Sequence, residues 1–147
     1  MKIVTLIVGL VALTSGALKA QNVRESELPE AVKKAFTQKF PDVKEVKWSK
    51  EGATEFEAEF EINKRAQSAN FDTKGKWLVT ETEIRKSDLP PSVQVTIEKE
   101  FPGYKIEEAE KAESWDNGSF YEVELKNGKL KYEIQLTADG KVIKKAN

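Results

Sequence analysis

The chain has 147 residues, of which 39% are hydrophobic and 33% are charged, a composition that suits one globular domain or two small packed halves. It contains no cysteine and no histidine, which excludes disulfide bonds, thiolate metal sites, the ordinary zinc ligands and the commonest general base. Its 24 basic and 25 acidic residues nearly balance, which argues against electrostatic binding of nucleic acid.

The N-terminal segment differs from all that follows. A short basic start precedes an apolar run over residues 3–13, and small residues then lead to Ala20. The pattern predicts a signal peptide over residues 1–20, because the apolar run is too short to span a hydrocarbon core of roughly 30 Å. Cleavage is expected near Ala20, with cleavage after Ala17 and an uncleaved membrane anchor as alternatives.

Export without cysteine favours a bacterial compartment. A secreted domain that lacks disulfides is stabilised by its core alone. We therefore expect a protein of the bacterial periplasm or the outside, with no stable membrane insertion once the signal peptide is removed.

The next segment, Gln21 to Glu27, is a polar lead-in that we expect to be loose. After it, one pattern occurs twice, at Leu28–Pro41 and at Leu89–Pro102. Each copy opens with Leu-Pro, closes with Phe-Pro and carries apolar residues at four-residue steps, which is one stripe of an amphipathic helix. Proline is tolerated at the first helical position and prevents the residue before it from continuing a helix. The pattern predicts two helices of about three turns each and a duplicated chain.

Four strands are predicted after the first helix, at residues 43–49, 55–62, 66–72 and 77–84. The second is the clearest, since apolar residues alternate with glutamates from Glu55 to Ile62. That alternation is typical of a strand with one face on a core and the other in water.

The second copy repeats this order with a gain of four residues around positions 113–119, where Asn117-Gly118 marks a loop. Alternating patterns at residues 121–126 and 131–136 predict two strands, and residues 141–143 predict a short last one. Asn127-Gly128 between the first two is a strong hairpin signal, since both residues accept positive φ.

The predicted fold class is α+β, a tandem repeat of one helix plus about four antiparallel strands. One helix covers four strands poorly, so we expect the halves to share a continuous core or a tight side-by-side interface. The repeats are placed at residues 21–86 and 87–147, forming one compact unit with Lys86–Asp88 as the link. Two sheets joined edge to edge would form a broad, curved platform.

Catalytic and metal sites are not expected. The glutamates of the second strand, including Glu57 and Glu59, are interpreted as a solvated face laid against lysines such as Lys64 and Lys131. A hydrolase that uses these glutamates is the alternative. The acidic turn at residues 72–75 lacks the run of oxygen ligands that a calcium loop needs, and no glycine-rich phosphate loop is present. No cofactor is therefore predicted.

Large aromatic residues are the candidate partner-binding residues, since tryptophan and tyrosine dominate binding hot spots when exposed. The candidates are Trp115, Tyr104, Trp48 and Trp77. The alternation of the predicted strands places Trp48 and Trp77 on the side that faces the core, so packing in the core is their alternative role. Trp115 lies in the inserted loop and is the first residue to test.

These motifs resemble the PepSY-like family of secreted proteins, described as beta-lactamase-inhibitor-like and common in Bacteroidetes. The matching segments are Leu28 to Pro41, Val46 to Trp48, Phe56 to Ile62, Phe71 to Trp77, Leu89 to Pro102, Tyr121 to Leu125 and Leu136 to Lys141. The resemblance implies a tandem helix and four-strand arrangement like that of the beta-lactamase inhibitor protein, whose concave sheet clasps an enzyme. PepSY domains are also proposed to restrain peptidases. This chain has no cysteine and none of the inhibitor's enzyme-contacting residues, so beta-lactamase inhibition is not implied.

We therefore expect a non-enzymatic exported binding module. Its partner is predicted to be another protein, with an envelope peptidase or other hydrolase as one candidate. The alternative is a small-ligand or ion carrier that uses the cleft between the repeats, which a large apolar pocket would favour.

Overall fold

The computed structural model describes residues 21–146, and the predicted signal peptide lies outside this range. In chain order, the elements are β1 (Gln21–Val23), the 3-10 turn η1 (Glu25–Glu27), α1 (Glu30–Lys39), β2 (Lys47–Glu51), β3 (Glu55–Ile62), β4 (Arg65–Asp72), β5 (Trp77–Glu83), the 3-10 turn η2 (Lys86–Asp88), α2 (Pro91–Glu100), β6 (Lys105–Ser114), β7 (Gly118–Asn127), β8 (Leu130–Leu136) and β9 (Val142–Ala146). The predicted α+β class is confirmed.

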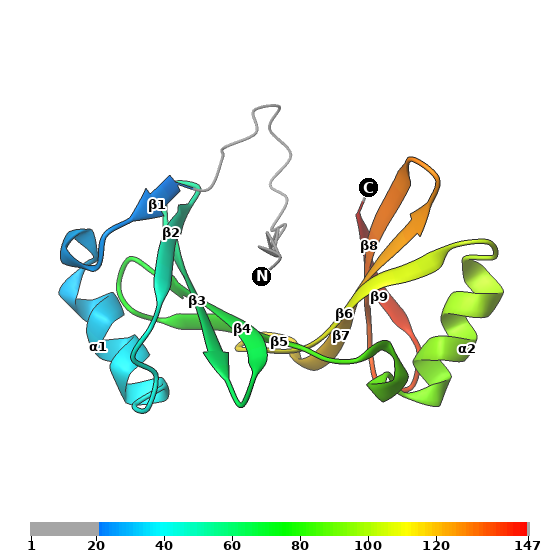
Figure 1. Ribbon diagram of the computed structural model, residues 1–147, viewed down its shortest axis with the longest axis horizontal. Helices are drawn as coiled ribbons and strands as arrows, with labels where there is room; N and C mark the ends of the chain where they lie inside the picture. Colours follow the sequence, from blue (N-terminus) through cyan, green and yellow to red (C-terminus); the bar gives the residue numbers. More distant parts are fainter. Residues whose placement is uncertain (1–20, 147) are drawn as a thin grey trace.

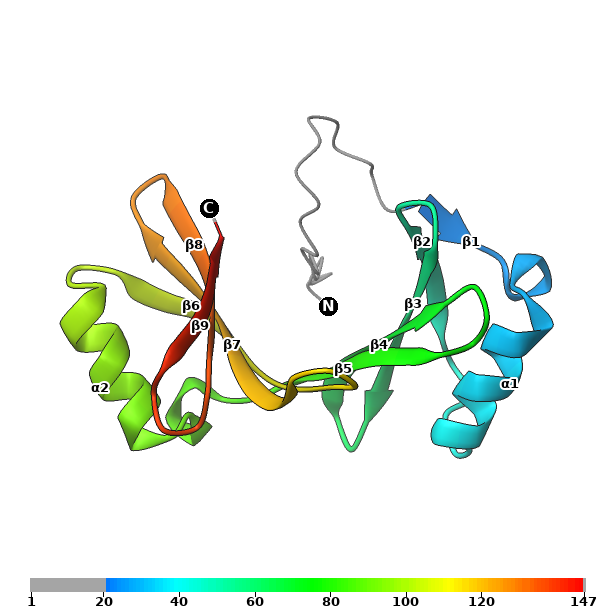
Figure 2. The ribbon, with the colours of Figure 1, turned by 180° about the vertical axis from the view of Figure 1, so that it is seen from behind.

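All the strands form one antiparallel sheet, in which each strand pairs with its neighbours in the sequence from β1 to β9. Figure 1 and the reverse view in Figure 2 show that this sheet is strongly curved, with α1 and α2 on its outer side at opposite ends. The register shifts where β5, β6 and β9 each carry one extra residue opposite β4, β7 and β8, and such bulges bend and twist the strands that carry them. Within residues 21–146, both helices lie on the outer side of the curve and none lies on the inner side (Figure 1).

The order of 3-10 turn, helix and four strands occurs twice. Both helices lie within the segments that the sequence predicts, and each ends where a phenylalanine precedes a proline. Phe40 donates its backbone N–H to the carbonyl of Phe36, and Phe101 donates to Ile97, so both helices stop at the same point of the pattern.

The polar lead-in is more ordered than expected. Gln21–Val23 forms β1, which pairs with β2 so that Val23 lies opposite Trp48 and packs against the core. Three residues are too few to show a period-two pattern, so this strand cannot be predicted from its own residues. The strand predicted over residues 43–49 begins later in the structure, since residues 43–46 are irregular and β2 begins at Lys47.

The hairpin at Asn127-Gly128 is shifted by one residue from the prediction. Asn127 pairs with Leu130, so Gly128 and Lys129 are the two turn residues, and only Gly128 has positive φ, at 59°. Glycine at the first turn position is typical of a type II′ turn, whereas the prediction assumed that both Asn127 and Gly128 take positive φ.

The hydrophobic core of the described residues is divided into two clusters, which fits the second of the two expected arrangements, halves that lie side by side, and not a shared core. The first cluster joins α1 to strands of the first half through side chains such as Val32 and Phe71. The second joins α2 to strands of the second half through side chains such as Val93 and Leu136. Each helix covers its own part of the sheet, so each half has its own apolar interior.

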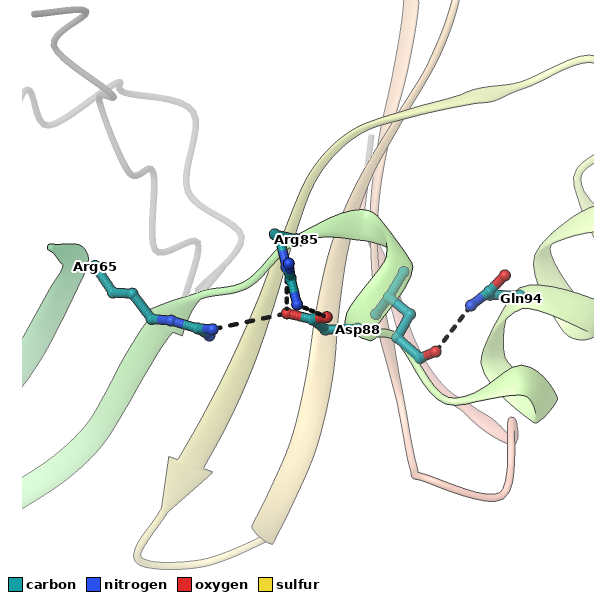
Figure 3. A network of polar contacts seen from close by, with 5 residues as sticks. Arg65, Arg85, Asp88 and Gln94 are labelled. Atoms are coloured by element: carbon teal, nitrogen blue, oxygen red, sulfur yellow. Dashed lines mark hydrogen bonds and ion pairs between the residues drawn. The ribbon is translucent and has the colours of Figure 1, made fainter. Parts of the chain in front are cut away.

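The halves are joined edge to edge, as the sequence analysis allowed. Strand β5 pairs with β6 from Val79 opposite Ser114 to Glu83 opposite Glu110. The predicted link is the 3-10 turn η2, whose polar contacts Figure 3 shows. Arg85 donates two hydrogen bonds to Asp88, at 2.8 and 3.1 Å. Because the junction is a strand pair, the two halves form one curved platform.

Two glycines hold corresponding turns against the helices. Gly75 precedes β5 with φ of 80°, and a Cβ atom there would overlap the backbone carbonyl of Ala31 in α1. Gly140 precedes β9 with φ of 87°, and its Cβ would overlap the carbonyl of Ser92 in α2. Only glycine combines this left-handed conformation with so close an approach.

The substitutions Gly75→Ala and Gly140→Ala should each lower the free energy of unfolding by about 2–4 kcal/mol, because alanine is strained in the left-handed conformation and its Cβ would overlap the helix. Urea unfolding followed by tryptophan fluorescence measures the loss. Gly52→Ala is the matched control, since Gly52 has φ of 63° with no atom within 4 Å of the added Cβ. Its expected loss is about 1 kcal/mol, and equal losses at all three sites would show that the approach to the helices contributes nothing.

Candidate functional site

The side of the sheet that faces away from the helices, the concave face, is acidic. Most apolar residues of the strands pack against the helices, so the residues between them, which include the apolar Phe120, point to the opposite side. Glutamates of five strands share that side: Glu55, Glu57, Glu59, Glu81, Glu83, Glu108, Glu110, Glu122, Glu124 and Glu133. The curvature of the sheet brings these side chains toward one another.

Several of these glutamates are buried. The relative exposures of Glu57, Glu81, Glu110 and Glu122 are 2, 2, 7 and 8%. The solvated-face interpretation is therefore wrong for Glu57, although Glu61 at the end of the same strand is exposed. Lys131, which was expected beside β3, instead bonds Glu124 in the other half at 2.6 Å.

Three of the buried carboxylates meet where the two halves join. One oxygen each of Glu81, Glu110 and Glu122 lies within 4.8 Å of the other two. Ser68 donates a hydrogen bond to Glu81 at 3.2 Å, and Gln135 donates one to Glu122 at 2.9 Å. The three residues, named here the glutamate triad, are close enough for one cation to contact all of them.

Burial raises the pKa of these carboxyl groups. The pKa of Glu81 is raised to about 9 by burial and then by repulsion from Glu122 and Glu110. The pKa of Glu110 is raised to about 8, mainly by burial and to a smaller extent by repulsion from Glu122. The pKa of Glu122 is also raised by burial, against the hydrogen bond from Gln135 and the charge of Lys144. Glu81 and Glu110 therefore hold protons at neutral pH unless a cation replaces them.

Two further polar groups of the concave face lack partners. Asn70 is 1% exposed, and neither its Nδ2 nor its Oδ1 makes a hydrogen bond of ordinary length among the described residues; a weak contact with Asn70 lowers the pKa of Glu55 against the larger effect of burial. Its cross-strand neighbour Glu57 accepts a hydrogen bond from Ser49 at 3.3 Å through Oε2, while Oε1 has no donor within residues 21–146. Burial raises the pKa of Glu57 to about 8, with repulsion from Glu51 and Glu59 adding to it. Buried polar groups without partners are rare, because each costs about 1–3 kcal/mol.

The four aromatic candidates are not brought together. Trp48 is 6% exposed within the first core cluster, which confirms its alternative role as a core residue. Trp77 is half-buried against the same cluster and donates a hydrogen bond to Thr80 at 2.9 Å. Tyr104 is half-buried in the second half, with its ring centroid 5.3 Å from that of Tyr132.

Trp115 is the exposed member of the four, at 55%, in the turn between β6 and β7. The Nζ of Lys76 lies 3.0 Å from its ring centroid. The concave glutamates were not predicted as a group, although the Glu-x-Glu alternation that recurs in several strands was a sign of a shared acidic face.

A groove of about 400 Å³ lies on the helix side, where the halves adjoin. Its lining combines α1, β4, β5 and β6 and includes the cationic side chains Lys39, Arg65 and Lys111. The lining is mainly polar and charged, so this groove is not the large apolar pocket that a carrier of apolar ligands needs.

Within residues 21–146, neither helix has the length and apolar character needed to cross a membrane. The fold defines a class of small α+β proteins in which a curved antiparallel sheet is covered by helices on one side and open on the other. The chain belongs to the PepSY-like family, provisionally described as beta-lactamase-inhibitor-like, whose sequence pattern matches residues 16–66 and 54–144. The resemblance seen in the sequence is thereby confirmed.

Three solved structures of Bacteroides proteins are similar to this chain. A DUF2874 family protein from Bacteroides uniformis is 24% identical, with 81% of this chain and 88% of that chain covered and a TM-score of 0.73. A BLIP-like protein from Bacteroides fragilis is 20% identical, with 81% and 85% covered and a TM-score of 0.68. A protein from Bacteroides eggerthii, provisionally described as periplasmic, is 18% identical, with 82% and 88% covered and a TM-score of 0.74. At these identities the similarity shows the fold alone. A comparison with curated protein sequences finds no match.

Proposed function

We propose that the protein is a non-enzymatic periplasmic module that binds another protein through the concave face of its sheet. The observation that carries the proposal is the set of buried carboxylates and unpartnered polar atoms on a sheet face that neither of the two described helices covers. Such groups are stabilised when a partner supplies the missing hydrogen bonds and charges.

The architecture supports the same proposal. The matching order of elements in the two halves, with Gly75 and Gly140 in corresponding turns, supports descent from a tandem repeat. The similar protein from Bacteroides fragilis is described as BLIP-like, and the family as beta-lactamase-inhibitor-like, so a curved sheet that grips an enzyme is a reasonable precedent. An envelope peptidase or other hydrolase is the candidate partner.

Affinity capture tests the proposal. The chain from residue 21 onward is immobilised, envelope extract is passed over it, and a retained protein is purified and mixed with it again. A stoichiometric complex, measured by size-exclusion chromatography with light scattering, is the expected result. Trp115→Ala tests whether the exposed tryptophan belongs to the interface.

Glu83→Lys and Glu98→Lys form a matched pair for locating the interface. Both glutamates are exposed, and both substitutions make the same charge change, but Glu83 lies on the concave face and Glu98 on α2. The Glu83 variant should lose the partner and the Glu98 variant should keep it. Loss with Glu98→Lys alone would place binding on the helix side.

A second candidate function is carriage of a small ligand or ion in the groove between the halves. Its volume of about 400 Å³ and its three cationic side chains favour an anion. Failure to retain any protein at low and moderate salt would favour this function over protein binding, and equilibrium dialysis with phosphate and small carboxylates would then test it.

A further inference from the structure

The concave face has an electrostatic pattern that restricts its partner. Its carboxylates extend from β3 to β8, across both halves and the junction between them. Among the described residues, the ion pairs found on this face are few, and Lys131 with Glu124 is one of them. An acidic surface of this extent attracts cationic partners and repels acidic ones.

The glutamate triad is the part of this surface that a cationic group would stabilise most. The Glu110 side chain is only 7% exposed, and the charged groups that act on it most strongly are other glutamates, Glu122 first. The acidic groups nearest to the triad are Glu57, Glu83, Glu108 and Glu133, and Lys144 adds positive charge beside Glu122. A cation that enters the triad therefore replaces protons and then lies among several carboxylates.

The unpartnered groups around Asn70 point to a polypeptide rather than a lone ion. Asn70 lies two residues along β4 from Ser68, which bonds the triad member Glu81, so a span of roughly 7 Å separates their positions on the strand. A metal ion held by the triad would coordinate oxygens at about 2.3–2.6 Å and could not reach Asn70. The Asn70 amide also needs both a donor and an acceptor, as a peptide backbone provides.

We propose that the concave face receives a basic segment of a partner protein, with one lysine or arginine side chain inserted into the glutamate triad and its backbone beside Asn70 and Glu57. The inference rests on the proposed protein-binding function and adds the chemistry of the partner. A guanidinium or ammonium group provides several donors, so it can satisfy three carboxylates at once. The side chain also displaces protons, because it stabilises the ionised form of each glutamate.

The test uses a fluorescein-labelled peptide of alternating glycine and arginine as the probe. A peptide of alternating glycine and glutamate and calcium chloride alone are the comparison ligands. Binding to the chain from residue 21 onward is measured by fluorescence anisotropy at about 0.15 M salt, where long-range attraction is largely screened. The arginine peptide should bind, and the glutamate peptide should not.

Two triple variants distinguish binding at the triad from general attraction to an acidic protein. E81Q/E110Q/E122Q removes the three carboxyl groups of the triad with little change in shape, whereas E25Q/E98Q/E100Q removes three carboxyl groups from exposed positions on the 3-10 turn η1 and α2. The triad variant should bind the arginine peptide about tenfold more weakly or worse. The surface variant should change less than about twofold. Equal weakening by both variants would overturn the proposal.

Proton release provides an independent readout. Calorimetry at neutral pH in buffers of different ionisation enthalpy should show roughly one proton released per bound arginine peptide, and fewer for the triad variant. Stoichiometric calcium binding that is lost in the triad variant and that blocks the peptide would overturn the proposal in favour of a metal site. An envelope protein that the triad variant retains as well as the parent does would overturn this inference while leaving the proposed function intact.

Discussion

Replacing Phe36 by alanine is expected to lower the free energy of unfolding by about 3–5 kcal/mol, the usual cost of deleting a buried aromatic side chain. Phe36 projects from α1 and is 6% exposed. Its ring centroid lies 5.1 Å from that of Trp48 and 5.3 Å from that of Phe60, so it joins the helix to β2 and β3. The first half has no second helix over its core to compensate.

Urea unfolding followed by tryptophan fluorescence measures this loss, since Trp48 lies beside the cavity that the substitution creates. Val95→Ala is the control, because Val95 on α2 is 60% exposed and its truncation should change stability by less than about 0.5 kcal/mol. A loss for Phe36→Ala no larger than that of the control would mean that α1 is not anchored to the sheet through this side chain.

Stability should fall as the pH rises from 6 to 8. The pKa values of Glu133, Glu57, Glu110 and Glu81 in the folded protein are raised to about 7, 8, 8 and 9, mainly by burial. Unfolded glutamate has a pKa of about 4.3, so the folded state binds more protons at neutral pH. The stabilisation that comes from this extra proton binding is complete below the unfolded pKa. It is lost as the pH rises through the raised pKa values of the folded protein.

Each glutamate that keeps its proton contributes a slope of about −1.4 kcal/mol per pH unit, so one such group gives a fall of about 3 kcal/mol between pH 6 and pH 8. Guanidinium unfolding at several pH values measures the slope. Groups with lowered pKa values, such as Asp139 beside Thr137, have the opposite dependence and destabilise the fold only in stronger acid.

Glu81→Gln tests the assignment of this pH dependence. An amide stays neutral at every pH, so the variant should be more stable than the parent at pH 8 and should show a smaller fall from pH 6 to pH 8. Glu98→Gln, at an exposed position of α2, should reproduce the parent curve. A parent protein whose stability increases between pH 6 and pH 8 would contradict the prediction.

Local sequence patterns determined the helices and most of the strands. The four-residue apolar steps between Leu-Pro and Phe-Pro depend only on helix geometry, and the structure places α1 and α2 within them. The period-two pattern of residues 55–62 likewise matches β3. Elements with weak patterns were misplaced, as β1 and the start of β2 show, because short segments become strands only when a neighbouring strand supplies their hydrogen bonds.

The sequence by itself determined the fold class, the family and the division of each strand into an apolar and a polar side. Only the tertiary structure decided that the polar side is the candidate site, because strand alternation fixes which side a residue takes but not how much water it meets there. The pairing of β5 with β6 and the curvature of the sheet bring Glu81, Glu110 and Glu122 together from separate strands. Burial and mutual repulsion depend on that three-dimensional arrangement, so no single strand could reveal them.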